Sequence, residues 1–199
     1  MSEQSATDGS PRVAGDAPAT APRAQRWTRR APWLAGGTAL VVVVTDQLSK
    51  LWAERSLTLG ERIPVLGDAL GVQLIYNPGA ALSIGAGSTW IFTIATAIGV
   101  VAGLWYAWRV RSRAWALALG LILGGAVTHL GDRLLREPSF GQGHVVDFIA
   151  YFDWFVGNVA DIAIVVGAGT FLVLTARGTT MRPEDTGTAE HTVVPGVEH

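Results

Sequence analysis

Residues 33–52 read WLAGGTALVVVVTDQLSKLW, an apolar run of about 20 residues with two charges towards its end. A helix of this length spans a hydrocarbon core of roughly 30 Å. A secretory signal peptide would start nearer the N-terminus and end at a small-residue cleavage site, and this run has neither property. We therefore predict a transmembrane helix whose second half carries Asp46 and Lys50, the only lysine of the chain.

Three further apolar runs follow, at residues 89–108, 114–135 and 159–176. Their length favours helices over the shorter strands of a membrane barrel. We predict an all-α membrane protein in which residues 33–176 form a four-helix domain. The segments 1–32 and 177–199 are polar and lack an apolar period, so we expect disordered tails there.

Composition supports a membrane protein and excludes several chemistries. Charged residues make up 16% of the chain, against roughly 25% in soluble domains. The net charge of -1 gives no indication of a nucleic-acid partner. The absence of cysteine excludes thiol catalysis, thiolate metal sites and disulfides.

Arginines predict the orientation of the four helices. The short loop 109–113 is basic, the N-terminal tail is basic next to the membrane, and Arg177 and Arg182 follow the last span. With four spans all three lie on one side, which the positive-inside rule places in the cytoplasm together with both termini.

Two segments then face outward, residues 53–88 and 136–158. The first contains the alternating stretch 72–76 between turn signals at 66–68 and 77–79, so we expect a small strand-containing cap. The second is rich in aromatic residues, which favour the bilayer interface, and we expect a loop there.

Ionisable side chains inside membrane helices are costly, by a few kcal/mol on insertion scales, and they usually face protein or water. In the predicted orientation they all fall in the outer parts of the helices, which leaves the inner halves uncharged. This asymmetry argues against a transport path, which needs polar groups near the midplane. It indicates a site that acts on something held at the outer leaflet. The residues concerned are Asp46, Lys50, His129, Asp132, Arg133 and Asp161.

The acids suggest a cofactor-free reaction. The sequence has no Ser-His-Asp pattern and no histidine pair at metal-ligand spacing, and a lone His129 is more often a structural hydrogen-bonding residue than a ligand. Two neighbouring carboxylates share a proton, so one can act on water as a base while the other donates a proton. This is aspartyl protease chemistry, although intramembrane acids also serve as structural ion pairs.

Two of the acids have a basic neighbour in sequence: Asp132 precedes Arg133, and Asp46 lies four residues before Lys50 on one helix face. These acids therefore read as structural or positioning groups. Asp147 and Asp161 have no such neighbour, which favours them as a reactive pair.

Asn158 at the start of the last span is a candidate helix cap. It would leave Asp161 in the first turn, where a favourable contact with the helix dipole is an equally good explanation for this acid.

The chain resembles the lipoprotein signal peptidases, also called signal peptidase II, over about residues 38–176. The resemblance rests on short segments in the family's order: 46–50 (DQLSK), 77–83 (NPGAALS), 124–126 (GGA) followed by 132–133 (DR), 145–148 (VVDF) and 158–161 (NVAD).

The resemblance implies an aspartyl endopeptidase of the bacterial cytoplasmic membrane that removes signal peptides from diacylglyceryl-modified prolipoproteins, without metal or cofactor. By carry-over, Asp147 and Asp161 form the catalytic pair, and Asp46 and Lys50 support the first helix. Nothing demands an oligomer, and we expect a monomer. The residues expected to shape the site or position the substrate are Asn77, His129, Asp132, Arg133 and Asn158.

The chain also departs from the family pattern. Thr128-His129 stands where the family usually has Gly-Asn, and Gly157 stands where it usually has Phe. The pair Gly124-Gly125 suits close helix packing, whereas Thr128 narrows the approach one turn later. A protonated His129 would be within reach of Asp132 on the same helix face.

These changes keep two other functions open. One is a catalytically weakened relative that binds lipidated precursors, and the other is an unrelated four-helix scaffold or carrier.

Overall fold

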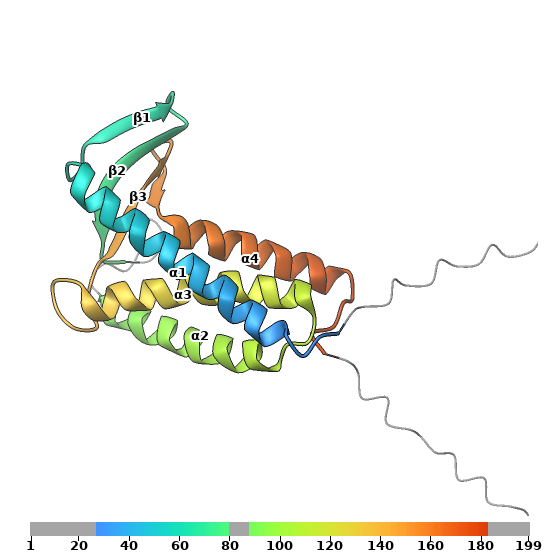
Figure 1. The fold of residues 1–199 in the computed structure, drawn as a ribbon. Helices are drawn as coiled ribbons and strands as arrows, with labels where there is room; N and C mark the ends of the chain where they lie inside the picture. The colour runs from blue at the N-terminus through green and yellow to red at the C-terminus, as the bar shows by residue number, and fades with distance from the viewer. Residues whose placement is uncertain (1–26, 80–87, 183–199) are drawn as a thin grey trace, which may run out of the picture.

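The computed structural model describes residues 27–79 and 88–182, which form four long helices and one antiparallel sheet (Figure 1). All four helices are long and apolar enough to cross a membrane. The prediction of four spans is confirmed, and the predicted bounds lie within four residues of the observed ones. The helices are α1 (Ala31–Ser56), α2 (Thr89–Arg109), α3 (Arg113–Leu135) and α4 (Val159–Ala176).

Helix α3 is the centre of the bundle, because it packs against each of the other three helices. Two adjacent glycines allow this close approach. A side chain at Gly124 would meet Ala39 and Val42 of α1, and one at Gly125 would meet Ile164 of α4 at 2.5 Å. The prediction of close packing at these glycines is confirmed. Two helices can approach α3 from different sides because successive helical residues point about 100° apart.

The sheet contains four strands in the order β1-β2-β3-β4, all antiparallel. The first two strands come from the predicted cap and meet at a turn where Gly67 has a φ of +51°, a conformation that favours glycine. The strands are β1 (Arg62–Leu66), β2 (Leu70–Asn77), β3 (Val145–Tyr151) and β4 (Phe155–Gly157).

The second outward segment differs from its prediction. We expected a loop over residues 136–158, and the structure places β3 and β4 there, so the description all-α is too narrow. Strand β3 is buried along almost its whole length, because it contacts both α1 and α3 as well as β2. A strand buried on both faces lacks the alternating polar pattern by which strands are recognised.

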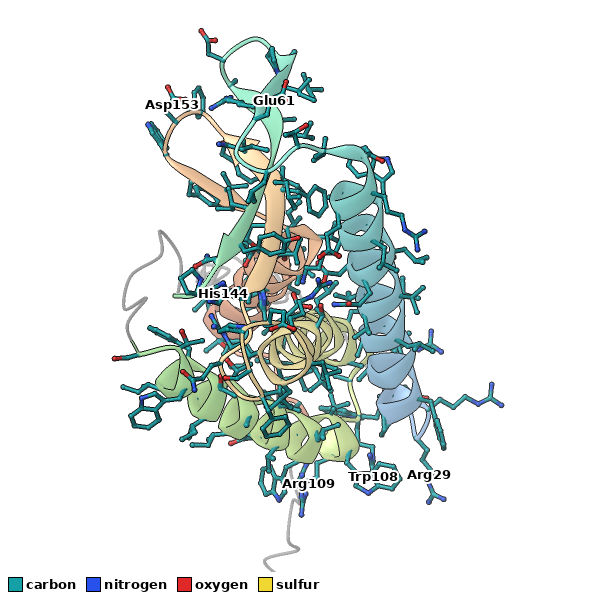
Figure 2. All side chains as sticks on the ribbon, turned by 90° about the vertical axis from the view of Figure 1, so that its left-hand side faces the viewer. Arg29, Glu61, Trp108, Arg109, His144 and Asp153 are labelled. Atoms are coloured by element: carbon teal, nitrogen blue, oxygen red, sulfur yellow. The ribbon has the colours of Figure 1, made fainter. Side chains whose placement is uncertain are left out.

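The two ends of the bundle differ in charge, as Figure 2 shows with Glu61 and Asp153 beside the strands and Arg29 and Arg109 at the opposite end. At the arginine end the chain segments are tied together, since Thr28 N donates to Arg111 O and Arg111 N donates to Met181 O. Within residues 27–79 and 88–182, the acidic side chains all lie towards the sheet end. The three arginine-rich segments therefore share one end, as the orientation argument requires.

Candidate active site

A cavity of about 580 Å³ lies where the sheet meets the helices, with walls from β2, β3, β4, α2, α3 and α4. One wall is polar and includes both predicted catalytic acids, Asp147 and Asp161. The rest of the lining is mostly apolar and comes mainly from α2, α4 and β4. The polar lining residues are Asn77, Thr96, His129, Arg133, Asp147, Tyr151 and Asp161.

Asp147 lies on β3 opposite Ile75 of β2 and is 3% exposed. Its Oδ1 accepts a hydrogen bond from Asn158 Nδ2 at 2.6 Å, and its Oδ2 accepts one from Asn77 Nδ2 at 2.9 Å. Burial raises the pKa of Asp147 to about 6, the nearby Asp161 raises it as well, and the two amide donors oppose the shift. Asp147 therefore retains a proton at pH values where an ordinary aspartate has lost it.

Asp161 lies in the first turn of α4 and is held by a capping box. Asn158 Oδ1 accepts a hydrogen bond from Asp161 N at 3.2 Å, and Asp161 Oδ2 accepts one from Asn158 N at 2.8 Å. The predicted cap at Asn158 is confirmed. These two reciprocal hydrogen bonds fix the carboxylate relative to the start of the helix. The Asp161 side chain remains 39% exposed and lines the cavity.

Asn158 connects the two acids. Its side-chain amide donates to Asp147, and its backbone N–H donates to Asp161. The residue is fully buried, and its Nδ2 also lies 3.3 Å from Val146 O. Two carboxylates from different elements are thus set in place by one residue, which accounts for the position of Asn158 in the predicted site.

His129 contacts a different acid from the one that its sequence position suggested. Its Nε2 lies 3.1 Å from Asp161 Oδ1, across the gap between α3 and α4. Asp132, the expected partner on the same helix, is instead bound to Lys50 of α1. The i, i+3 rule identifies neighbours along one helix. Here His129 and Asp132 each contact a residue of another helix instead.

Arg133 also differs from its sequence interpretation, because it forms no ion pair with the adjacent Asp132. Its guanidinium donates to the backbone carbonyls of Pro78 and Gly79 and lies 5.6 Å from the centre of the Phe92 ring. Arg133 therefore fastens the segment after β2 to α3 and lines the cavity. Adjacent residues of a helix point in different directions, which separates Arg133 from Asp132.

Asp46 and Lys50 belong to a closed ion network next to the cavity. Lys50 Nζ lies 2.6 Å from both Asp46 Oδ2 and Asp132 Oδ2, and all three side chains are almost fully buried. Asp46 Oδ1 also accepts a hydrogen bond from Ala160 N, at 2.9 Å, in the first turn of α4. The network therefore connects α1, α3 and α4 behind the cavity wall, and Asp132 belongs to it rather than to the cavity lining.

The polar residue Thr128 belongs to this network too. It donates to Asp46 and accepts from Gln47 Nε2 at 2.8 Å, and its side chain is buried. Its hydroxyl thus makes hydrogen bonds between α3 and α1 at the point where we expected it only to narrow the approach.

Sequence reasoning missed several participants. Arg136 Nε lies 2.9 Å from Asp132 Oδ1, and its NH1 lies 2.5 Å from Glu54 Oε1. The i, i+4 spacing of Asp132 and Arg136 was a signal that could have identified the first pair. Tyr151 and Phe155 stack at 4.8 Å and line the cavity, and no local pattern marks them.

Burial and neighbouring charges also act on two of these groups outside the spans. Burial and then the charge of Asp161 raise the pKa of Tyr151, which keeps its phenol protonated. The neighbouring Asp132 raises the pKa of Arg136 against the effect of burial, so this cation remains charged. Within the described residues, no group of three His, Asp or Glu side chains is arranged to hold a metal ion.

These features define a class of protein: a multi-pass membrane protein with a pair of aspartates in a cavity at one end of its helices. Comparison with known proteins identifies the family. Residues 38–177 match the family model described as signal peptidase (SPase) II, and the chain belongs to this family.

Curated relatives agree with this assignment. The chain is 49% identical over 142 residues to the lipoprotein signal peptidase of Leifsonia xyli. This match covers 70% of this chain and 65% of that protein. It is 46% identical over 147 residues to the lipoprotein signal peptidase of Rhodococcus jostii, with 73% of each chain covered. The match therefore spans slightly less than two thirds of the Leifsonia protein.

The fold is also similar to a solved structure described as a bacterial membrane enzyme. The TM-score is 0.65 at 25% identity, over 80% of this chain and 96% of the other. Family membership and this similarity do not favour an unrelated scaffold or carrier.

Proposed function

We propose that this protein is an aspartic endopeptidase that removes signal peptides from diacylglyceryl-modified prolipoproteins, with Asp147 and Asp161 as its catalytic pair. The observation that carries the proposal is the cavity in which these two carboxylates lie, each held by Asn158. The substrate class follows from the chain's membership of the signal peptidase II family and from its relatives' description as lipoprotein signal peptidases.

The chemistry follows from a pair that holds one proton. The ionised aspartate takes a proton from water as the water oxygen bonds to the scissile carbonyl carbon, and the protonated aspartate gives its proton to the carbonyl oxygen. The tetrahedral diol then collapses and the C–N bond breaks. The nitrogen receives the proton taken from water, and a diol proton returns to the other aspartate, which restores the starting pair.

The raised pKa of Asp147 supports this division of the proton, because it keeps one carboxyl group protonated close to neutral pH. The proposed reaction needs no metal or cofactor. Activity is therefore expected to be unchanged by a strong metal chelator, and a loss that added metal restores would contradict this part of the proposal.

The apolar wall of the cavity suits a lipid-modified substrate. Helices α2 and α4 both pack on α3 and, within the described residues, make little contact with each other. Phe92 and Thr96 of α2 face the cavity together with Ile162, Val165 and Val166 of α4. Val165 is 69% exposed, so this side is apolar and open towards the surrounding lipid. We propose that acyl chains and the apolar signal segment reach the acids from this side.

The remaining predicted residues take supporting roles in this proposal. Asn77 and Asn158 position Asp147, and Arg133 holds the segment after β2 at the cavity. Asp132, Asp46 and Lys50 hold the helices together behind it.

The sidedness of the protein is part of the proposal. The arginine end would face the cytoplasm together with both terminal tails, 1–32 and 177–199. The sheet and the cavity would then lie at the outer face, and the enzyme would act as a monomer. The molecular mass of the detergent-purified protein would test the monomeric state. Labelling of single-cysteine variants from either side of the membrane would test the sidedness.

The direct test is cleavage of a diacylglyceryl-modified prolipoprotein by the purified full chain in detergent, beside its Asp161→Asn variant. We expect cleavage by the parent and none by the variant, since the amide can neither take nor give the required proton. Failure of both, from a folded sample that still binds the substrate, would replace the proposal by a non-catalytic binding protein.

A further inference from the structure

Both oxygens of the Asp161 carboxylate have a partner. Oδ2 accepts from the backbone of Asn158, and Oδ1 lies 3.1 Å from His129 Nε2. An ionised carboxylate only accepts hydrogen bonds, so a histidine that donates from Nε2 favours the ionised form in either of its protonation states. Among the described residues, the Asp147 carboxylate, in contrast, receives only side-chain amide donors, from Asn77 and Asn158.

Two of the three departures from the pattern of the family, His129 and Gly157, meet at this same carboxylate. His129 contacts Oδ1, and a Cβ added at Gly157 would lie 2.8 Å from Oδ2. Gly157 therefore leaves Asp161 the space in which His129 reaches it. The family's usual Asn at position 129 has an uncharged amide, whereas an imidazole can also carry a positive charge near neutral pH.

The other charged groups around His129 come from three elements. Asp147 of β3 is close enough to interact electrostatically with the imidazole, and Arg133 lines the cavity one helical turn away on α3. Lys50 of α1 acts on Asp161, but its ammonium is already paired with Asp46 and Asp132. Helix α2 contributes only the uncharged Phe92 and Thr96 to the cavity. Tyr151 of β3 completes the titratable lining.

We propose that His129 is a positioning residue that keeps Asp161 ionised, so that Asp161 takes the proton from water and the shared proton of the pair resides on Asp147. The role of each acid in hydrolysis rests on the proposed function, while the ionisation of Asp161 by His129 does not. The proton on Asp147 is free to point into the cavity, because its hydroxyl oxygen can still accept from an amide.

The test compares kcat/KM against pH for the parent, His129→Ala and His129→Gln, with the full chain in detergent and a diacylglyceryl-modified prolipoprotein. His144→Ala is the matched control, because His144 lies outside the cavity lining. Activity is lost at low pH when Asp161 takes up a proton. In His129→Ala we expect this acid limb to move up by about one pH unit, a tenfold loss on the limb itself, since a hydrogen bond to a charged group is lost.

His129→Gln retains an N–H donor without the charge, so its acid limb should lie between those of the parent and His129→Ala. The control should keep the parental profile. If kcat/KM of His129→Ala fell by the same factor at every pH, the pH at which activity is lost on the acid side would be unchanged. That result would show a merely structural role and overturn the proposal.

A second measurement does not depend on cleavage. Infrared difference spectra between each protein and its Asp161→Asn counterpart report whether Asp161 is a carboxylate or a carboxylic acid. We expect carboxylate at mildly acidic pH in the parent and a larger acid fraction in His129→Ala. An equal fraction in both would refute the proposal, whereas a parent that cleaves nothing but shows the expected spectra would refute only the proposed function.

Discussion

The ion network around Lys50 and the cavity around Asp147 lie side by side at the sheet end, yet they balance their charges differently. In the network, Lys50 is fully buried and contacts Asp46 and Asp132 directly, and Arg136 pairs with Asp132 and Glu54. In the cavity, Arg133 lines the wall but its guanidinium is bound to backbone carbonyls. The acids of the network are therefore compensated by direct ion pairs, whereas the pair in the cavity can hold and exchange a proton.

The difference teaches that burial alone does not make an aspartate reactive. Asp46 and Asp132 are as deeply buried as Asp147. What separates them is direct contact with Lys50, which both of these acids make and Asp147 does not. Changes to each group should therefore affect different properties of the protein.

The largest effect is expected for Asp147→Asn, which removes the proton donor from the cavity and keeps its shape. Loss of a positioned acid or base reduces rates by about 10²–10⁴-fold. We expect kcat to fall by this factor for a diacylglyceryl-modified prolipoprotein, with the unfolding temperature unchanged or raised. A variant with more than half of the parental kcat would remove Asp147 from the proposed pair.

Lys50→Met should act on stability instead. It leaves buried Asp46 without its cation and Asp132 with Arg136 alone, and breaking a buried ion pair in this way costs about 3–5 kcal/mol. Chemical unfolding in detergent micelles would measure the loss. Arg55→Met, on the same helix at an exposed position without an ion pair, is the matched control and should change little.

Adding Asp46→Asn to Lys50→Met should recover part of the lost stability, because the uncompensated charge is removed. If Lys50→Met and Arg55→Met were equally mild, the network would not hold the helices together as described.

The pH dependence of stability should separate the two groups of acids as well. Burial raises the pKa of Asp147 from its ordinary value near 4 to about 6, so between these values the folded protein binds more protons than the unfolded chain. Stability from this group is therefore present at low pH and is lost as the pH rises from about 4 to 6, by up to about 3 kcal/mol.

Unfolding of the parent and of Asp147→Asn across this range would show the effect as a steeper decline in the parent. If the free energy of unfolding changed with pH in the same way for both proteins, Asp147 would be ionised to the same extent in the folded and the unfolded state.

Gly157→Ala should have a smaller effect, confined to the cavity. The added methyl group would lie 2.8 Å from Asp161 Oδ2 and displace that carboxylate. Small misplacements of reacting groups cost up to about 100-fold, and we expect a loss of about 10-fold to 100-fold in kcat/KM. Gly99→Ala, where the structure leaves open space, is the control. Equal activity of both variants would show that Asp161 has room to move.

The sequence was sufficient to predict the helices, because an apolar run that spans a bilayer must satisfy its backbone hydrogen bonds internally, which leaves few alternatives to a helix. The bounds of α4, for example, were predicted to the residue. The strands were only half predicted. Strand β2 alternates and follows a turn signal, whereas β3 is buried on both faces and contains and is followed by aromatic residues that also suit a membrane interface.

In the candidate site, local rules predicted what lies within one helical turn. They identified the cap at Asn158 and the contact between Asp46 and Lys50. They could not predict which helices face each other, and so they assigned His129 and Arg133 to the wrong partners. That Asp147 and Asp161 line one cavity was expected from the family resemblance, since nothing in the spacing of the two residues requires it.

The cap of α4 has a consequence for how the protein is made. Asn158 belongs to the start of the last span, and Asp46 of the first span binds the neighbouring Ala160 backbone. During synthesis the first three spans can enter the membrane before residue 158 exists, and until then Asp147 lacks the partner that aligns it with Asp161. The peptidase would thus acquire its activity only after its fourth span has been made and has met the first.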